Sequence, residues 1–360
     1  MPTPPSLLWP TIEVGKSSAT ATYARATFDK SPVWAALQLV AALVFSSYFF
    51  FWIFGVGALW LAVSANIISS FGAWCLVAAY ILSIFVYKPH KGSGWPFGWF
   101  LYSPVVDLCL GYYGARMIRE GPPLDPTKRY LFAMSPHGVF GVCRAFSGGR
   151  CWTSLFAGIT ARWGSFSGAF AIPGVREFSL SCGCLDASRP VLSRAIGRGE
   201  NIMLLPGGEK EMMLTDGNSN ITQLVLAERK GFVRLAITHG LQLVPGFCFG
   251  EKWVHEAVRL PGPIRSFLYR QFRIAGVVLI GRWWTFLGKV HKPDGSPISL
   301  GFVWGAPIPV RHETEPSEEY VDEVHAAFVA AITDLFERHK RGFGYPANES
   351  LSIVSAKRNV

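Results

Sequence analysis

The hydrophobic pattern divides the chain into an uncharged N-terminal stretch and a longer region of alternating elements. Residues 33–86 contain no Asp, Glu, Lys or Arg. One helical pass through a bilayer needs about 20 apolar residues, so this stretch is long enough for two passes and a turn. Glycine and polar residues interrupt it between residues 55 and 66. The pattern therefore predicts a transmembrane helical hairpin with helices over residues 33–54 and 67–87.

Positive charges flank this hairpin at both ends. Lys30 precedes the first helix, and Lys88 and Lys91 follow the second. By the positive-inside rule, both ends of the hairpin are expected to face the cytosol. Two alternatives stay open: a single long tilted span followed by an interfacial segment, and a buried helical hairpin in a soluble protein.

Short apolar strands alternate with helical segments after about residue 128. Each predicted strand is bounded by Pro or Gly, and Ser317 stands where the N-cap of the last helix belongs. Strands that alternate with helices are typical of an α/β fold. The predicted strands cover residues 130–134, 201–205, 241–249 and 276–280, and the predicted helices cover residues 224–239 and 317–339.

Composition strengthens the membrane interpretation. Half of the 360 residues are hydrophobic and only 16% are charged, whereas a soluble domain carries about 25% charged residues. The net charge of +10 favours anionic partners. The chain has 13 Trp and 27 Phe and no nucleic-acid-binding motif, so we expect lipid rather than nucleic acid as that partner.

A histidine is predicted at the end of the first strand of the alternating region. Ser135-Pro136-His137-Gly138 directly follows the apolar residues 130–134. Proline cannot continue the strand, so the segment ends there and places His137 at the edge of the sheet, where α/β folds bind ligands. A neutral imidazole at this position could act as a general base. The alternative is a purely structural Pro-Gly turn.

A glycine turn with a nearby carboxylate follows the second strand. Gly207 and Gly208 could present backbone N–H groups to an anion or a developing oxyanion, and Glu211 could orient the base. The alternative is a tight strand-to-helix turn. It is not a P-loop, because no G-x-x-x-x-G-K-[ST] sequence is present.

The third candidate functional feature is a basic segment. Arg229, Lys230 and Arg234 lie near one end of the predicted helix over residues 224–239, an arrangement that could bind phosphates. The alternative is a solvated basic face.

Other chemistries lack their sequence signatures. The seven cysteines are odd in number and scattered, and Cys182 and Cys184 have no second pair at zinc-ligand spacing, so we predict neither a disulfide framework nor a metal site. The chain also has no G-x-S-x-G, H-E-x-x-H or G-x-G-x-x-G sequence. Val142 stands at the fifth position after His137, so the His-x-x-x-x-Asp dyad of phospholipid acyltransferases is missing.

In combination, these motifs resemble the diacylglycerol O-acyltransferase type 2 family, which includes monoacylglycerol and wax-alcohol acyltransferases. The resemblance runs in order over residues 130–351. The family's His-Pro-His-Gly motif aligns with Ser135-Pro136-His137-Gly138, with Ser135 replacing the first histidine. Further matches are Ser181, Gly183, Ser188 and Arg189; Gly207, Gly208 and Glu211; Arg229, Gly231, Phe232 and Arg234; His239 and Gly240; Val244 and Pro245; Phe249, Gly250 and Glu251; and Phe343, Gly344 and Pro346.

The resemblance implies a reaction and a role for each motif. It implies acyl transfer from acyl-coenzyme A to a lipid hydroxyl, with His137 as the catalytic base and no metal or other cofactor. Glu211 is the expected orienter of that base, and Glu251 is a second candidate. Backbone N–H groups of Gly138, Gly207 and Gly208 are candidates for the oxyanion site. The expected substrate-binding residues are Ser135, Arg229, Lys230, Arg234, His239 and Glu251.

The acceptor is expected to be diacylglycerol, giving triacylglycerol. A monoacylglycerol or long-chain alcohol acceptor stays open, as does a non-catalytic scaffold role, which only the change at Ser135 favours. The expected location is the endoplasmic reticulum membrane with both termini cytosolic, and a hairpin without a lumenal domain could also reach a lipid droplet. The sequence leaves self-association open.

The expected organisation has five parts. A disordered cytosolic segment covers residues 1–32, and the transmembrane hairpin covers residues 33–87. An interfacial connector covers residues 88–127, before the membrane-associated α/β acyltransferase domain over residues 128–346. A tail over residues 347–360 completes the chain.

Overall fold

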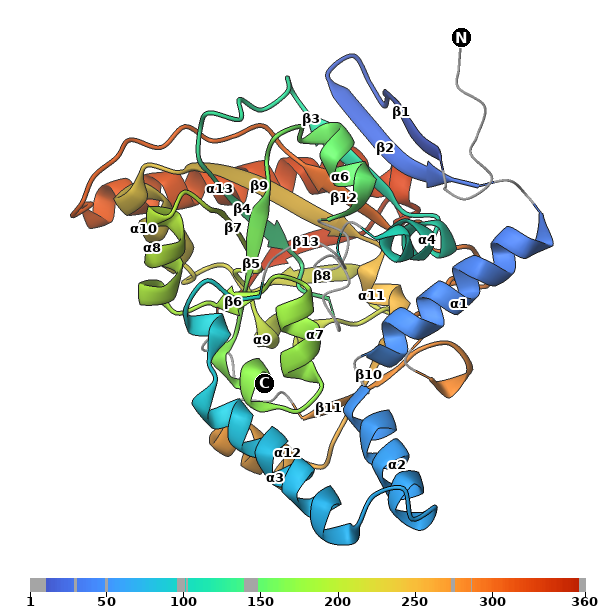
Figure 1. Cartoon of the computed structure of the whole chain (residues 1–360). Coiled ribbons are helices and arrows are strands. Elements are labelled where there is room, and N and C mark those ends of the chain that lie inside the picture. The colour runs from blue at the N-terminus through green and yellow to red at the C-terminus, as the bar shows by residue number, and fades with distance from the viewer. Residues whose placement is uncertain are drawn as a thin grey trace.

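A nine-stranded mixed sheet forms the centre of the protein, as the computed structural model in Figure 1 shows. The strands lie in the order β1-β2-β3-β12-β9-β4-β7-β5-β6. Strands β9, β4, β7, β5 and β6 run parallel to one another, and β12 pairs antiparallel with β9. The structure describes residues 11–28, 31–48, 51–95, 101, 103–138, 148–272, 276–285 and 287–355.

The strands have the following bounds. Those of the main sheet are β1 (Thr11–Lys16), β2 (Ala21–Thr27), β3 (Arg116–Glu120), β4 (Tyr130–Ser135), β5 (Ala161–Ser165), β6 (Leu185–Asp186), β7 (Asn201–Leu204), β9 (Gln242–Phe249) and β12 (Gly301–Trp304). Two smaller sheets pair β10 (Glu256–Arg259) with β11 (Val277–Ile280), and β8 (Ile221–Leu224) with β13 (Ser350–Ile353).

Helices surround the main sheet. The first are α1 (Pro32–Tyr48), α2 (Phe51–Ser64), α3 (Ser70–Val86), η1 (Pro89–Lys91), α4 (Pro104–Tyr112), α6 (Gly149–Leu155), η2 (Ser167–Ala171), α7 (Val175–Ser181) and α8 (Arg189–Gly197). The others are α9 (Glu209–Leu214), α10 (Gly231–His239), α11 (Glu251–Val254), α12 (Gly262–Phe272), η3 (Arg282–Trp284), α13 (Glu318–His339) and η4 (Lys340–Phe343).

Buried aromatic side chains pack on both faces of the sheet. Phe132 of β4 and Trp304 of β12 lie edge-on to Trp152 of α6. Phe247 of β9 contacts Phe336 of α13, with ring centroids 5.2 Å apart. Since side chains alternate along a strand, helices α6 and α13 cover opposite faces. The ends of β4, β7 and β9 are therefore held between two packed layers.

The α/β prediction is confirmed, and several elements lie where the sequence placed them. The predicted strands over residues 130–134, 201–205 and 241–249 correspond to β4, β7 and β9. Ser317 caps α13 by accepting a hydrogen bond from the Tyr320 N–H at 3.2 Å. The helix predicted over residues 224–239 is shorter: β8 ends at Leu224, and α10 begins at Gly231.

The predicted domain boundaries differ from the structure. Residues 11–27, expected to be disordered, form the β1–β2 hairpin, which extends the sheet through β3. Alternating residues of β1 point to the same face, and Arg25 of β2 donates to Glu13 at 2.7 Å. The expected connector contains β3, and the expected tail contains β13. Both belong to the α/β domain because their backbone groups pair with its strands.

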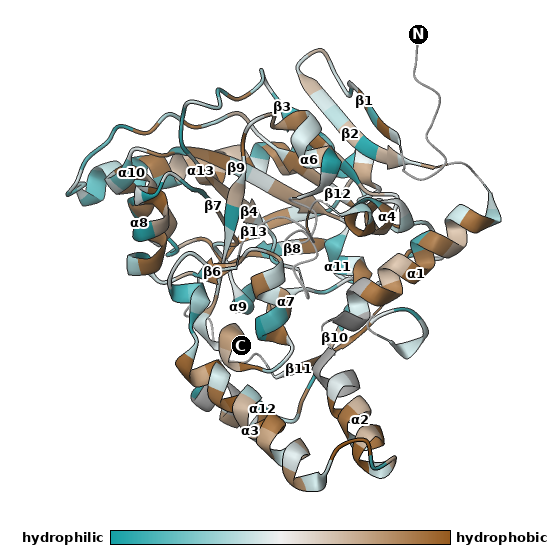
Figure 2. Ribbon diagram, in the orientation of Figure 1, coloured by the Kyte–Doolittle hydropathy of each residue, from teal (hydrophilic) through white to brown (hydrophobic). Residues whose placement is uncertain are grey.

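Within residues 31–48 and 51–95, the apolar stretch contains three helices, α1, α2 and α3, where the sequence predicts two. Helix α2 continues through Gly55 and Gly57, and the turn follows at residues 65–69. Among the described residues, Ser70–Lys91 is the one helical stretch long and apolar enough to cross a membrane, while Pro32–Val44 and Gly55–Ser64 are shorter. The complete hairpin is therefore not confirmed. Figure 2 shows hydrophobic residues along α1, α2 and α3.

Arginine side chains attach the segment after α3 to the α/β domain. Their guanidinium groups donate to backbone carbonyls, which otherwise lack partners at the end of a helix. The pairs are Arg176 with Tyr87, Arg194 with Lys91, Arg198 with Gly92 and Arg162 with Ser93, at 3.0 to 3.3 Å. The end of the candidate membrane helix is thus fixed to the domain that carries the sheet.

Candidate active site

His137 lies just beyond the carboxyl end of the central strand β4. Strand β4 pairs with β9 on one side and β7 on the other, all parallel. The Ser135–Pro136 peptide bond is cis, and Gly138 has a φ of 63°. The His137 side chain is buried, with 6% of its surface exposed. Residues 135–138 thus form the irregular turn that the sequence predicts, and His137 lies at the ligand-binding edge of the sheet.

Glu211 holds the backbone of this turn. Its carboxylate is fully buried; Oε2 accepts from the His137 N–H at 2.7 Å, and Oε1 accepts from the Val225 N–H at 2.9 Å. Glu211 therefore joins the segments that follow β4, β7 and β8. Glu211 is the expected orienter of the base, but its contact reaches the backbone of His137 rather than its ring.

The two glycines before α9 have different functions. The Glu211 carboxyl group lies directly against Gly207, where a Cβ atom would overlap it. Gly208 has a φ of 61°, and its N–H donates to Leu205 O at 3.1 Å. Because the Gly208 N–H is already used in this bond, Gly208 is better explained as part of a strand-to-helix turn than as an oxyanion donor. Gly207 is required because the carboxyl group occupies the space of a side chain.

The imidazole of His137 has a defined neighbour. Its Nδ1 lies 3.1 Å from Gly138 O. A carbonyl oxygen only accepts hydrogen bonds, so in the neutral ring we assign the proton to Nδ1 and the lone pair to Nε2. This tautomer presents Nε2 as the atom that can accept a proton.

The protonation of Glu211 is sensitive to pH near neutrality. Burial raises its pKa to about 7, opposed by the backbone N–H groups of His137 and Val225 and by the positive charge of Arg229. The Arg229 Nε is buried without a hydrogen-bond partner among the described residues. Arg229 is thus the predicted basic residue that acts on this part of the site.

Replacing Glu211 with glutamine is expected to change how stability depends on pH. Because its pKa is raised from 4.5 to about 7 in the folded protein, this carboxyl group lowers the free energy of unfolding as pH rises across that range. Glu211→Gln loses one acceptor oxygen and, because glutamine does not ionise, also loses this dependence on pH. Thermal denaturation of detergent-solubilised protein should show a larger Tm deficit for the variant at about pH 5 than at about pH 8. A deficit that grows with pH would contradict the assignment.

Glu251 approaches the same turn from the neighbouring strand. It begins α11 directly after β9 and is 1% exposed. A Cβ atom on Gly138 would overlap the Glu251 side chain, so the two residues are in contact. The Cys248 thiol donates to Glu251 Oε2 at 2.9 Å. The structure therefore brings together His137, Glu211 and Glu251, as the motifs predict.

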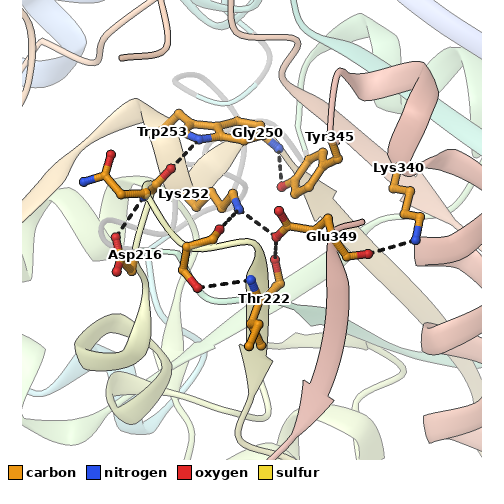
Figure 3. A network of polar contacts seen from close by, with 12 residues as sticks. Asp216, Thr222, Gly250, Lys252, Trp253, Lys340, Tyr345 and Glu349 are labelled. Atoms are coloured by element: carbon orange, nitrogen blue, oxygen red, sulfur yellow. Dashed lines mark hydrogen bonds and ion pairs between the residues drawn. The ribbon is translucent and has the colours of Figure 1, made fainter. Parts of the chain in front are cut away.

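A buried polar network fixes α11, and sequence reasoning missed it (Figure 3). Lys252 forms an ion pair with Glu349 at 2.7 Å, and both side chains are almost fully buried. Thr222 also donates to Glu349 at 2.7 Å, and Tyr345 Oη accepts from the Gly250 N–H at 3.0 Å. Two sequence matches lie near this network: Phe-Gly-Glu, which contains Gly250, and the terminal Phe-Gly-x-Pro, which ends at Pro346.

The remaining predicted binding residues lie elsewhere. Lys230 pairs with Asp322 at 2.5 Å and Arg234 pairs with Glu318 at 2.7 Å, both on α13. These contacts fit the alternative of a solvated basic face.

His239 and Ser135 complete the predicted set. His239, at the far end of α10, hydrogen-bonds Ser193 of α8 at 2.9 Å. Arg229 lies two residues before α10 begins, so the length of this helix, about 13 Å, lies between it and His239. Ser135 is the first residue of the turn; it is fully buried, and its Oγ has no hydrogen-bond partner within the described part of the chain.

In the described ranges, no group of three or more His, Cys, Asp or Glu side chains could hold a metal ion.

Known proteins match this chain over most of its length. The family model for diacylglycerol acyltransferase matches residues 67–354. Acyl-CoA wax alcohol acyltransferase 1 from Homo sapiens is 31% identical over 78% of this chain and 88% of its own. From Bos taurus, 2-acylglycerol O-acyltransferase 1 is 30% identical over 77% and 85% of the two chains, and diacylglycerol O-acyltransferase 2-like protein 6 is 29% identical over 74% and 82%.

A solved structure gives a weaker match. The 1-acyl-sn-glycerophosphate acyltransferase from Thermotoga maritima covers 81% of this chain and 97% of its own, at 14% identity and a TM-score of 0.36. That similarity is too low to establish a shared fold. The family match and the relatives, by contrast, show that this chain belongs to the diacylglycerol acyltransferase family. It is therefore an acyltransferase of lipid metabolism.

Proposed function

We propose that the protein transfers a fatty acyl group from acyl-coenzyme A to the free hydroxyl of diacylglycerol, forming triacylglycerol. The observation that carries this proposal is the turn at the end of β4. There, the His137 ring has its Nδ1 beside Gly138 O, and its backbone N–H is held by buried Glu211. Membership of the diacylglycerol acyltransferase family supports the reaction class.

His137 is the proposed general base. Nε2 of the neutral ring takes the proton of the acceptor hydroxyl as its oxygen attacks the thioester carbonyl carbon. The carbonyl oxygen becomes an oxyanion, and a backbone N–H of Gly138 or Gly207 is the proposed donor to it. When the C–S bond breaks, the imidazolium returns its proton to the leaving coenzyme A thiolate. The reaction needs no redox step, because a thioester is already activated.

Glu211 and Glu251 are proposed to keep His137 in place. Glu211 does so through the backbone N–H, and Glu251 does so through its contact with Gly138. A displacement of about 1 Å in a catalytic group can lower a rate by about 10²-fold. We therefore assign both carboxylates to positioning of the turn.

Arg229 is the leading candidate for binding coenzyme A phosphates, because its Nε has no hydrogen-bond partner among the described residues. Lys230 and Arg234 stay in the proposal, but they would have to share their existing acidic partners. The Ser135 hydroxyl is proposed to contact the substrate. His239, at the opposite end of α10, is also proposed to bind the substrate.

Parallel acyl-transfer assays test the acceptor. Microsomes from a host without its own triacylglycerol synthesis would receive radiolabelled acyl-coenzyme A with diacylglycerol, 2-acylglycerol or a long-chain alcohol. We expect label in triacylglycerol with diacylglycerol. The names of the relatives point to other acceptors. Preference for one of them would leave the proposed acyl-transfer mechanism unchanged but give a different product. No transfer by correctly inserted protein would favour a scaffold that lost catalysis with the change at Ser135.

The proposed location is the endoplasmic reticulum membrane with both termini cytosolic, and lipid droplets are a second proposed location. The apolar helices and the candidate span Ser70–Lys91 support membrane association. In the same microsomes, glycosylation acceptor sequences fused to either terminus should stay unmodified. Modification of one terminus would contradict this topology. Cross-linking in these membranes would also detect self-association, which the sequence left open.

A further inference from the structure

Residues 255–288 form an excursion that leaves the domain beside the active site and returns to the same place. It starts directly after α11, and Lys289 N donates to Val254 O at 2.8 Å, so its two ends meet. It contains β10, α12, β11 and η3. Strands β10 and β11 pair with each other and lie outside the main sheet. The excursion is therefore a separate layer that leaves and re-enters the domain at the same place.

Helix α12 is mostly exposed over the side chains that the structure describes. None of the side chains that the structure describes in it is buried, and Ile264 and Phe267 are 50% and 57% exposed. An isolated helix of fewer than about 12 residues is marginal in water, because packing of an apolar face supplies most helical stability. The exposed apolar side chains of α12 thus indicate a further surface that covers them.

Two consecutive tryptophans project from the end of the excursion. Trp283 and Trp284 are 58% and 87% exposed. Their φ angles of 55° and 59° lie in the left-handed region, which bulky residues rarely adopt. The Arg282 guanidinium stacks on the Trp283 ring, 4.3 Å from its centroid. Tryptophan beside a cation is typical of side chains at a membrane–water interface.

The excursion is strongly basic. Its single acidic residue, Glu256, is paired with Lys289. Its arginines are Arg259, Arg265, Arg270, Arg273 and Arg282. Apolar and aromatic side chains together with many cations are the features of segments that lie in the plane of an anionic membrane.

The excursion lies on the same side of the molecule as two of the apolar helices. In Figures 1 and 2, α12, β10 and β11 lie toward the lower end of the molecule with α2 and α3, away from β1 and β2. Helix α3 forms the first part of the candidate span Ser70–Lys91. The excursion also contacts the site, because Arg259 donates to Met213 O of α9 at 2.6 Å. Helix α9 carries Glu211.

We propose that the excursion is a second membrane-contacting element, which lies on the surface of a bilayer that contains anionic phospholipids. Phe267, Trp283 and Trp284 enter the interface, and Arg265, Arg270 and Arg282 bind the phosphate and carboxylate groups of the lipids. This contact is additional to the apolar helices. It does not depend on which acceptor the enzyme uses.

Photo-crosslinking of the full-length protein in nanodiscs tests the proposal. A photo-crosslinking amino acid replaces Trp284 in one variant and Val14 in the matched control, since Val14 is 49% exposed on β1. The nanodiscs contain phosphatidylcholine alone or phosphatidylcholine with phosphatidylserine. We expect phospholipid adducts from position 284 but not from position 14, with a higher yield when phosphatidylserine is present.

An arginine variant tests the charge contribution. One arginine near an anionic surface contributes about 1 kcal/mol, so Arg270→Gln should lower the phosphatidylserine-dependent gain by about fivefold. Equal yields in both kinds of nanodisc would overturn the anionic preference. Absence of lipid adducts at position 284, or adducts to a second protein chain there, would overturn the membrane contact itself. None of these outcomes depends on acyl transfer.

Discussion

His137→Ala is expected to lower kcat by about 10²–10⁴-fold, the usual contribution of a general base. The variant removes Nε2, which we assign as the proton acceptor, but keeps the backbone N–H that donates to Glu211. The turn at the end of β4 should therefore keep its conformation, and KM should change far less than kcat. Steady-state acyl transfer in microsomes measures both constants.

A second histidine supplies the control for this variant. His312 is exposed and contacts Thr238 O at 3.1 Å, away from the turn. His312→Ala should keep normal turnover. Membrane fractionation would show that both variants are inserted equally. Near-normal turnover by His137→Ala would exclude the proposed mechanism.

Gly207→Ala is expected to lower kcat by about 10²-fold, although no reacting atom is removed. A Cβ atom at this position would overlap the Glu211 carboxyl group, and Glu211 would have to move away from the His137 N–H. The turn would then lose the hydrogen bond that holds it. The measurement is kcat for acyl transfer, made alongside the Tm of the detergent-solubilised protein.

Gly231→Ala is the matched control, since Gly231 belongs to another of the family motifs. No atom lies within 4 Å of a Cβ built on Gly231, and it is the first residue of α10. Alanine favours a helix over glycine by up to about 1 kcal/mol, so this variant should be active and no less stable. Equal activity of the Gly207 and Gly231 variants would show that the contact with Glu211 is not needed.

The sequence predicts the central strands well, because their signals are local. Strands β4, β7 and β9 are short apolar runs that end at Pro or Gly, and Ser317 precedes a helix with a regular apolar repeat. The β1–β2 hairpin was missed because Ser, Thr and Pro dominate its surroundings. Its stability comes from pairing with β3, almost 100 residues later in the chain.

The same distinction between local and long-range signals applies to the candidate site. His137, Glu211 and Glu251 belong to motifs, and the structure brings them together. The Lys252–Glu349 pair joins residues 97 positions apart, and no local pattern connects them. Lys230 and Arg234 illustrate the opposite case. Their spacing predicts a phosphate site, but the acidic side chains that face them come from α13, which the helical pattern alone could not place.

The late position of Glu349 has a consequence for synthesis of the protein. The ribosome makes α3 long before it makes Glu349, so the candidate span can enter the membrane while α11 still lacks the partner of Lys252. Glu251 is then not fixed against Gly138, and the site is incomplete. The candidate span is therefore complete in the growing chain well before the site can be assembled.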